Sequence, residues 1–156
     1  MIKTALLADH PETIPTLIRW FTAQWGAYYA QFSPAEIVHS FEKEAQRDGL
    51  PIRLVAFVDD DLAGTITLRE QAIQSHPDYH PGVGGLLVLE QYRKQGVGTA
   101  LVRASMALAH KQGFQTLYAT TIAAKGVLTR LGWQQVSTLV HDEEQLHLYQ
   151  YELRTP

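Results

Sequence analysis

The sequence predicts a single α/β domain in which helices flank a mixed, largely antiparallel sheet. Short runs rich in β-branched and aromatic residues alternate with longer segments whose apolar residues recur at helical spacing. Two of these runs, residues 52–58 and 62–69, are joined only by acidic turn residues, which favours an antiparallel hairpin. Another run, residues 84–89, leads into an amphipathic helix and then a further strand, which requires one parallel crossover. The chain of 156 residues can bury one core and has no linker, so we expect one domain over residues 1–156.

The first part of the chain predicts one strand and two helices before the hairpin. Residues 2–8 form a short apolar run, and Asp9, followed by an early proline and an acidic residue, predicts the N-cap of a helix. That helix carries apolar residues at helical spacing and ends at Gly26. A second helix starts at Ser33, where Ser-Pro-Ala-Glu combines a capping box with proline at the first helical position, and residues 49–51 stop it.

The rest of the chain predicts a loop, a crossover helix and a closing pair of strands. Residues 70–81 form a polar loop with two prolines, and its length favours a functional role. An amphipathic helix from Val97 is closed by Gly113. The remaining elements that we expect are a strand over residues 116–121, a short helix over 123–131, and paired strands over 134–140 and 145–153.

The composition excludes several classes of function. The formal net charge of −3 gives no general affinity for nucleic acid or anionic membranes, and no apolar run is long enough to span a bilayer. The chain has no cysteine, which excludes disulfides, thiolate metal sites and a covalent acyl-cysteine intermediate. The N-terminal segment breaks at Asp9 and Pro11 before it could form a signal-peptide core. We therefore expect a cytoplasmic protein with no nucleic-acid or membrane partner.

The decapeptide YRKQGVGTAL, residues 92–101, places two glycines where a predicted strand meets a predicted helix. The first N–H groups of a helix have no partner within it, and the helix dipole adds positive potential there. Gly96 and Gly98 let an anion approach these amides, while Arg93 and Lys94 add positive charge. The motif therefore predicts a phosphate site, and the alternative is a plain helix start with a solvated basic pair.

Two well-known phosphate-binding loops do not match this motif. The mononucleotide loop needs lysine and then serine or threonine after its last glycine, whereas Thr99 follows Gly98 directly. The dinucleotide fingerprint needs a small residue where Leu101 stands and an acidic residue about twenty positions later, where the chain has Leu117. An unrelated nucleotide-binding fold stays open as an alternative, and ATP or NAD, but not CoA, would then protect the protein against heating.

A third pattern does match. Arg93-x-x-Gly96-x-Gly98, preceded by the apolar run at residues 86–89 and followed by an amphipathic helix, resembles the acyl-CoA signature of the GNAT superfamily of N-acetyltransferases. The order of the predicted elements is similar to that family over nearly the whole chain. LTRLGW, residues 128–133, resembles the family segment that ends in Leu-Gly-aromatic, and LADHPETIPTLIRWF and HPDYHPGVGGLLV resemble its small bacterial-type acetyltransferase branch. The resemblance implies the GNAT fold.

The resemblance also implies acetyl-CoA as the co-substrate. In the family the pantetheine arm pairs with the strand before the signature, which here comprises Leu87, Val88 and Leu89. The pyrophosphate lies on the amides of the signature, which implies a site formed by Arg93, Lys94, Gln95, Gly96, Val97, Gly98 and Thr99. The physical argument from the glycines and the family resemblance therefore agree.

The reaction that the resemblance implies is direct attack of a small-molecule amine on the acetyl thioester, and the lack of cysteine agrees with this route. The mild net negative charge suits a cationic acceptor, although net charge does not define a pocket. An amine of pKa near 10.4 must lose a proton, at a cost of about 4–5 kcal/mol at pH 7, so a general base is expected. Glu70 is preferred and Asp78 and His80 are alternatives, while a plain exposed acid is the competing interpretation of Glu70.

One position departs from the family. Many relatives place a tyrosine four residues before the glycine of the Leu-Gly-aromatic segment, where it protonates the leaving thiolate, and this chain has Leu128 there. Solvent, Thr121, Thr129 or Tyr118 is left as the proton donor. The departure leaves open a catalytically silent acyl-CoA-binding or regulatory module as the alternative function.

Two further features have expectations of their own. His76, Asp78 and His80 lack a fourth ligand, so no metal site is expected. The aromatic-rich segment over residues 20–32 is expected to supply core residues and one or two contacts to the acceptor. Because dimers are common in the family, a homodimer is left open.

Overall fold

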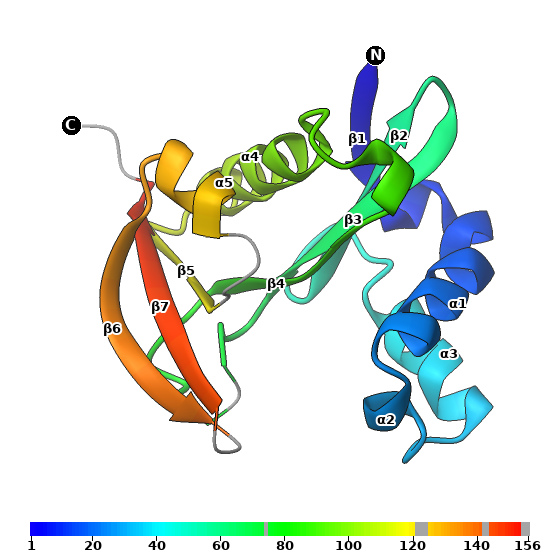
Figure 1. The fold of residues 1–156 in the computed structure, drawn as a ribbon, viewed down its shortest axis with the longest axis horizontal. Helices are drawn as coiled ribbons and strands as arrows, with labels where there is room; N and C mark the ends of the chain where they lie inside the picture. The colour runs from blue at the N-terminus through cyan, green and yellow to red at the C-terminus, as the bar shows by residue number, and fades with distance from the viewer. Residues whose placement is uncertain (74, 121–124, 142–143, 154–156) are drawn as a thin grey trace.

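The computed structural model describes residues 1–73, 75–120, 125–141 and 144–153, which form one seven-stranded sheet with helices on both faces (Figure 1). The strand order is β1-β2-β3-β4-β5-β7-β6, and every adjacent pair is antiparallel except β4 with β5. This arrangement confirms the predicted α/β fold with a mixed, largely antiparallel sheet. The strands are β1 (Ile2–Leu6), β2 (Ile52–Val58), β3 (Asp61–Arg69), β4 (Gly82–Val88), β5 (Thr116–Thr120), β6 (Gln134–His141) and β7 (Glu144–Glu152).

The helices follow the predicted order, and the β2–β3 hairpin and the parallel crossover from β4 through a helix to β5 are confirmed. The predicted helix start at residue 123 and the strand end at residue 121 lie outside the described residues. Of the helices described, none has the length and apolar character needed to span a membrane. The helices are α1 (Ile14–Gln24), α2 (Gly26–Tyr29), α3 (Pro34–Lys43), α4 (Val97–Lys111) and α5 (Lys125–Arg130), with 3₁₀ turns η1 (Leu7–Asp9), η2 (Pro11–Thr13) and η3 (Glu90–Tyr92).

The first helix does not start where the sequence predicts. Asp9 is not its cap, because Asp9 lies in η1 and its carboxylate accepts a hydrogen bond from Arg47, which lowers the pKa of Asp9. Helix α1 begins only at Ile14, after the second 3₁₀ turn. Helix α1 ends at Gln24, close to the predicted stop at Gly26, and after a break at Trp25 a single further helical turn, α2, begins at Gly26. The ion pair with Arg47 uses the carboxylate that a cap would need.

Helix α3 begins at the predicted capping box. The Ser33 hydroxyl accepts the N–H of Glu36 at 3.1 Å, and the Glu36 carboxylate accepts the N–H of Ser33 at 2.9 Å. These hydrogen bonds hold the pKa of Glu36 below its ordinary value. The helix ends at Lys43, earlier than the glycine at residue 49 suggests, and residues 44–51 form the connection to β2.

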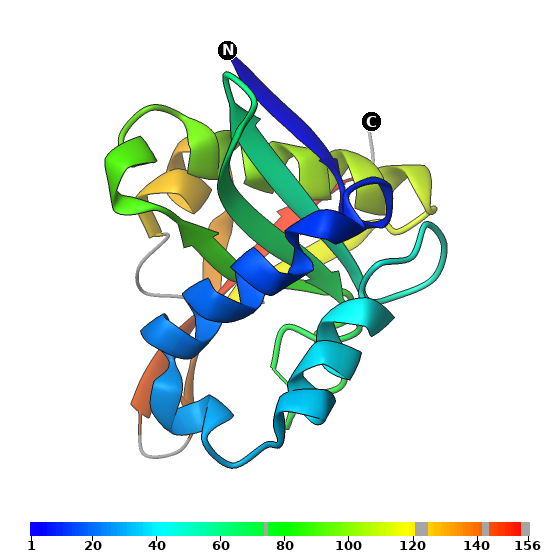
Figure 2. The same cartoon turned by 90° about the vertical axis from the view of Figure 1, so that its right-hand side faces the viewer.

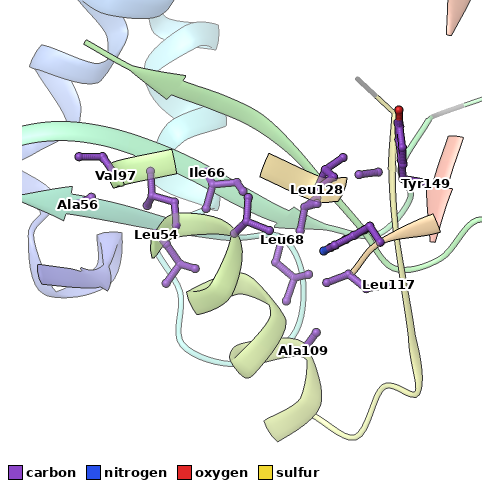
Figure 3. Close-up of a cluster of buried hydrophobic side chains, with 14 of the residues drawn as sticks. Leu54, Ala56, Ile66, Leu68, Val97, Ala109, Leu117, Leu128 and Tyr149 are labelled. Carbon is purple, nitrogen blue, oxygen red and sulfur yellow. The ribbon is translucent and has the colours of Figure 1, made fainter. Parts of the chain in front are cut away.

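Helices α1 and α3 lie on one face of the sheet and α4 lies on the other (Figure 2), and alternate residues of β2 pack into these two layers. Leu54 and Ala56 belong to the larger core with α4 (Figure 3), whereas Val55 packs with Phe21 of α1 and Phe41 of α3. Successive side chains of a strand point to opposite faces, so the sheet separates an α4 face from an α1–α3 face. The candidate site uses both faces, at the place where β4 leaves β5.

Candidate functional site

Strands β4 and β5 separate soon after they meet. They pair at Gly82 with Tyr118 and at Val83 with Ala119, whereas β4 stays paired with β3 as far as Val88. Beyond Val83, the edge of β4 on the β5 side has no strand partner in the described part of the chain (Figure 1). An unpaired strand edge offers main-chain hydrogen bonds to an extended ligand.

The three residues predicted to contact pantetheine do not all face this open edge. The N–H of Leu89 donates to the carbonyl of Ala63 at 2.9 Å, so Leu89 faces β3. Because alternate residues direct their peptide groups to opposite edges of a strand, Leu87 also faces β3 and Val88 faces the open edge. The Val88 carbonyl accepts a hydrogen bond from Nε of Arg93 at 3.0 Å. Val88 is therefore the member of the set that an extended ligand would meet.

Six successive backbone N–H groups at the start of α4, those of residues 94–99, have no hydrogen-bond acceptor among the described residues. The next one, of Ala100, donates to the carbonyl of Gly96 at 2.9 Å and begins the regular helical pattern. Free amides at the positive end of a helix dipole attract an anion. The predicted phosphate loop thus has the donors that a pyrophosphate needs.

Glycine stands at residues 96 and 98 of this loop for two different reasons. Gly96 is the N-cap residue, with φ of +92°, a left-handed conformation that favours glycine. Gly98 lies inside α4, and a Cβ there would meet only Val88 and Val127, each at 3.9 Å. The fold alone therefore does not require glycine at residue 98. Its missing side chain leaves space beside the free amides.

The polar side chains of the loop are exposed, and two of them form hydrogen bonds with backbone carbonyls nearby. Arg93 binds the end of β4 through Val88, and Nε2 of Gln95 donates to the carbonyl of Gln91 at 2.9 Å. Lys94 is exposed and has φ of +63°, which is unusual for a residue other than glycine. The positive charges of Arg93 and Lys94 thus belong to the same loop as the free amides.

A groove of about 790 Å³ lies on the α1–α3 face, under the aromatic-rich segment. Tyr28 and Phe32 are 57% and 37% exposed and line it, together with Tyr29 and residues of α3. Phe21 and Phe41 are buried at its inner end and belong to the core. The segment over residues 20–32 thus supplies both core and groove wall.

Two arginines form the floor of this groove. Arg53 is 3% exposed and donates to both carboxylate oxygens of Glu44, at 2.9 and 3.3 Å, and to the hydroxyl of Thr65 at 3.1 Å. The side chain of Arg69 has no hydrogen bond or ion pair with any residue that the structure describes. Burial, and then the charge of Arg53, lower the pKa of Arg69.

Sequence reasoning missed both arginines as site residues. The available indication was period-two polarity in β3, where Thr65, Thr67 and Arg69 alternate with apolar residues. Alternation places all three on one face, but it does not say which helices cover that face. Only the packing of α1 and α3 makes them the floor of a groove.

The candidate bases lie around the end of β3 and in the loop that follows. Glu70 is exposed and lines a second pocket of about 440 Å³ together with Arg69 and Thr120. Asp78 is exposed, and the Nδ1 of His80 lies in hydrogen-bond contact with the carbonyl of Glu70. Of the three, Glu70 adjoins the place where β4 and β5 separate. In the described part of the chain, no cluster of three or more His, Asp or Glu side chains could hold a metal ion.

Leu128 is 1% exposed and packs in the α4-face core, so it provides no proton donor (Figure 3). Thr129 is exposed, Tyr118 is half-buried, and Thr121 lies outside the described residues. Sequence reasoning did not consider Tyr149, which is 2% exposed and whose hydroxyl has no partner among the described residues. In the sequence, Tyr149 looks like any core tyrosine of a strand, so nothing marked it as a possible proton donor.

Comparison with protein families gives one match. The model described as the acetyltransferase (GNAT) family matches residues 14–133, which include α1, strands β2 to β5, the glycine loop before α4, and α5. No curated protein is similar enough in sequence to count as a relative.

Several solved structures share the fold over the full chain. An aminoglycoside 6′-N-acetyltransferase complexed with coenzyme A matches with a TM-score of 0.75 and 15% identity, covering 100% of this chain and 98% of that one. The aminoglycoside 6′-N-acetyltransferase from Enterococcus faecium matches with a TM-score of 0.73 and 17% identity, covering 100% and 98%. The protein yncA from Salmonella typhimurium, with its cofactor acetyl-CoA, matches with a TM-score of 0.72 and 12% identity, covering 98% and 94%. At these identities the likeness establishes the fold alone.

Proposed function

Because the chain belongs to the acetyltransferase (GNAT) family, we propose that it transfers the acetyl group of acetyl-CoA directly to the amine of a small-molecule acceptor, without an acyl-enzyme. The observation that carries the proposal is the row of free amides at residues 94–99 beside the open edge of β4. A pyrophosphate needs the free amides, and an extended pantetheine arm needs the open strand edge. The similar structures that hold coenzyme A or acetyl-CoA support this choice of co-substrate.

The residues present fit such a co-substrate. The amides of residues 94–99 would hold the diphosphate, with Arg93 and Lys94 adding charge, and Val88 would pair with the arm. Acetyl-CoA supplies the activated acetyl group. Each amide contact at a helix end contributes about 0.3–2 kcal/mol, so several together are needed for micromolar affinity.

We assign the removal of the amine proton to Glu70. A protonated amine cannot attack, and Glu70 lines the pocket at the separation of β4 and β5, where solvent also reaches it. Asp78 and His80 are the weaker alternatives, since neither lines that pocket. We assign protonation of the leaving thiolate to solvent, because Leu128 offers no hydroxyl and a thiol of pKa near 8.5 leaves readily.

The second candidate function is a catalytically silent acyl-CoA-binding module, which the buried Leu128 favours. Thiol release from acetyl-CoA across an amine panel, combined with calorimetry of CoA binding, separates the two. Thiol release with at least one amine is the expected outcome. CoA binding without turnover for every amine would favour the silent module, and absence of CoA binding would exclude both. A single domain over residues 1–156, a cytoplasmic location and a homodimer stay predictions from the sequence.

A further inference from the structure

We propose that Arg69 and Thr67 bind an oxyanion of the acceptor, so that the acceptor is an amine that also carries a carboxylate or a phosphate. This inference rests on the proposed function, because it describes the acceptor of that reaction. It differs from the expectation of a cationic acceptor drawn from net charge.

The guanidinium of Arg69 occupies space that β4 leaves free. A Cβ built on Gly84 would lie 2.6 Å from Cζ of Arg69 and 2.7 and 2.8 Å from its two terminal nitrogens. At Gly85, where φ is +59° and the β3–β4 register shifts by one residue, a Cβ would lie 3.3 Å from Nη2 of Arg69. The guanidinium therefore rests on the bulge of β4, next to the open edge.

A second donor points to the same place. The Oγ1 of Thr67 is fully buried and has no hydrogen-bond partner among the described residues. It lies 3.3 Å from the Cβ position of Gly85, the same separation as Nη2 of Arg69. Buried hydroxyls without a partner are rare, because leaving one unpaired costs about 1–3 kcal/mol. Two donors without partners therefore flank one site.

The groove floor carries an unbalanced positive charge, because its two arginines face one glutamate. Arg53 is neutralised by Glu44 through two hydrogen bonds, and its remaining bond goes to Thr65. Arg69 makes no such hydrogen bond. The nearby Glu44 charge raises the pKa of Arg69, but that carboxylate is bonded to Arg53, and burial and the charge of Arg53 outweigh its effect. A planar guanidinium binds the two oxygens of a carboxylate or phosphate side by side. An anionic ligand would supply the missing counter-charge.

The position of Arg69 also relates the anion to the reacting amine. Arg69 lines both the aromatic groove and the smaller pocket that contains Glu70 and Thr120. An acceptor whose anion binds Arg69 can therefore direct its amine toward Glu70. Its apolar part can lie along Tyr28 and Tyr29 in the groove. Amino acids with an apolar side chain have all three features.

A matched acceptor series tests the inference. The series contains phenylalanine, its neutral amide, phenethylamine, an amino-alkyl phosphate and a polycationic aminoglycoside, each assayed by thiol release from acetyl-CoA. We expect kcat/KM for the carboxylate or the phosphate amine to exceed that of the neutral amide at least tenfold, and the two anionic arms identify which oxyanion is used. If kcat/KM for the neutral amide equals that for the anionic acceptors, or if the aminoglycoside is preferred, the inference is overturned while the proposed function stands.

Variants show whether Arg69 is responsible. Arg69→Gln should lower kcat/KM for the anionic acceptor about 10- to 100-fold more than it lowers kcat/KM for phenethylamine. Arg69→Lys should restore part of the loss, because it keeps the charge without the fork. The control is Arg103→Gln, which removes the same charge from an exposed position on α4. An equal loss for charged and neutral acceptors in Arg69→Gln contradicts the inference.

A binding measurement keeps the test independent of turnover. Calorimetry with N-acetylphenylalanine and N-acetylphenylalanine amide, in the presence of CoA, measures the preference for the anion directly. Tighter binding of the carboxylate, lost in Arg69→Gln, supports the inference even if no amine is acetylated. Equal affinity for the two compounds overturns it.

Discussion

Arg53 is a cation buried in the α1–α3 face. Its guanidinium lies 4.8 Å from the ring centre of Phe21 and 5.0 Å from that of Phe41, and it pairs with Glu44. Its backbone N–H also donates to the Glu44 carbonyl at 3.0 Å. The pair joins the end of α3 to β2 and keeps the floor of the groove in place.

Removing the Glu44 charge should therefore destabilise the fold. Glu44→Gln leaves Arg53 buried without its counter-ion, and we expect a loss of about 3 kcal/mol in the free energy of unfolding. Urea denaturation followed by circular dichroism measures this loss. Glu42→Gln, at an exposed position near the end of α3, should change stability by less than about 0.5 kcal/mol. Similar values for the two variants would show that the ion pair contributes nothing.

Glu70 can be tested by the pH dependence of the rate. If Glu70 takes the amine proton, Glu70→Gln should lower kcat about 10- to 100-fold at pH 7 and much less above pH 10, where most of a primary amine is already neutral. Steady-state thiol release over that pH range gives the profile. Asp78→Asn is the matched comparison and should leave the profile unchanged. A profile for Glu70→Gln that parallels the native one would remove Glu70 as the base.

At the scale of elements, α4 combines two tasks. Its buried residues Val97, Leu101 and Val102 attach it to the sheet, while the free amides before Ala100 point to a ligand role. Gly96 is needed for the backbone, so a substitution there would disturb folding and binding together. Gly98 separates these effects, because the fold leaves room for a side chain.

Gly98→Val should weaken CoA binding at least tenfold with little change in the unfolding temperature. The branched side chain would stand where the diphosphate must approach the amides. Calorimetry and thermal unfolding measure the two effects. Gly26→Val is the control, since nothing lies within 4 Å of a Cβ at Gly26, and it should leave CoA affinity unchanged. Undiminished affinity in Gly98→Val would argue against the phosphate site.

At the scale of the whole molecule, the proposed co-substrate site joins two elements that the crossover brings together. The sheet supplies the open edge of β4 and the loop before α4 supplies the amides, while the groove on the opposite α1–α3 face supplies the acceptor side. In the proposed reaction the acetyl group and the amine would thus approach from different sides of the sheet.

Hydrogen exchange can test both parts of the proposed co-substrate site, the loop amides and the open edge of β4, in one experiment. The amides of residues 94–99 should exchange fast in the free protein, because they lack acceptors, and slow markedly with CoA. Pantetheine, which lacks the diphosphate, should protect Val88 but not residues 94–99. Amides of α4 beyond Ala100 serve as the internal control, since they are already bonded within the helix. Unchanged exchange at residues 94–99 with saturating CoA would exclude the assigned phosphate site.

Local patterns in the sequence sufficed for several features. The Ser33 capping box, the hairpin and the glycines before α4 depend on residues close together in the chain, and they follow from dihedral preferences and unpaired helix-end amides. Asp9 was misjudged as a cap because its partner, Arg47, is distant in sequence. The motif at residues 92–101, taken together with the order of the elements and LTRLGW at residues 128–133, was likewise enough to predict the family.

Residues near one another in the chain were enough to predict the order of the elements and the glycine loop before α4, for which phosphate binding stays a prediction. Three other features needed the packed structure: β4 leaves β5 after Val83, Val88 faces the open edge, and the Arg69 guanidinium lies against Gly84 with no side-chain partner among the described residues. These features come from strand register and from packing between segments far apart in sequence. The net charge of the chain suggested a cationic acceptor, whereas the charges that surround one groove favour an anionic one, since electrostatic recognition depends on local distances.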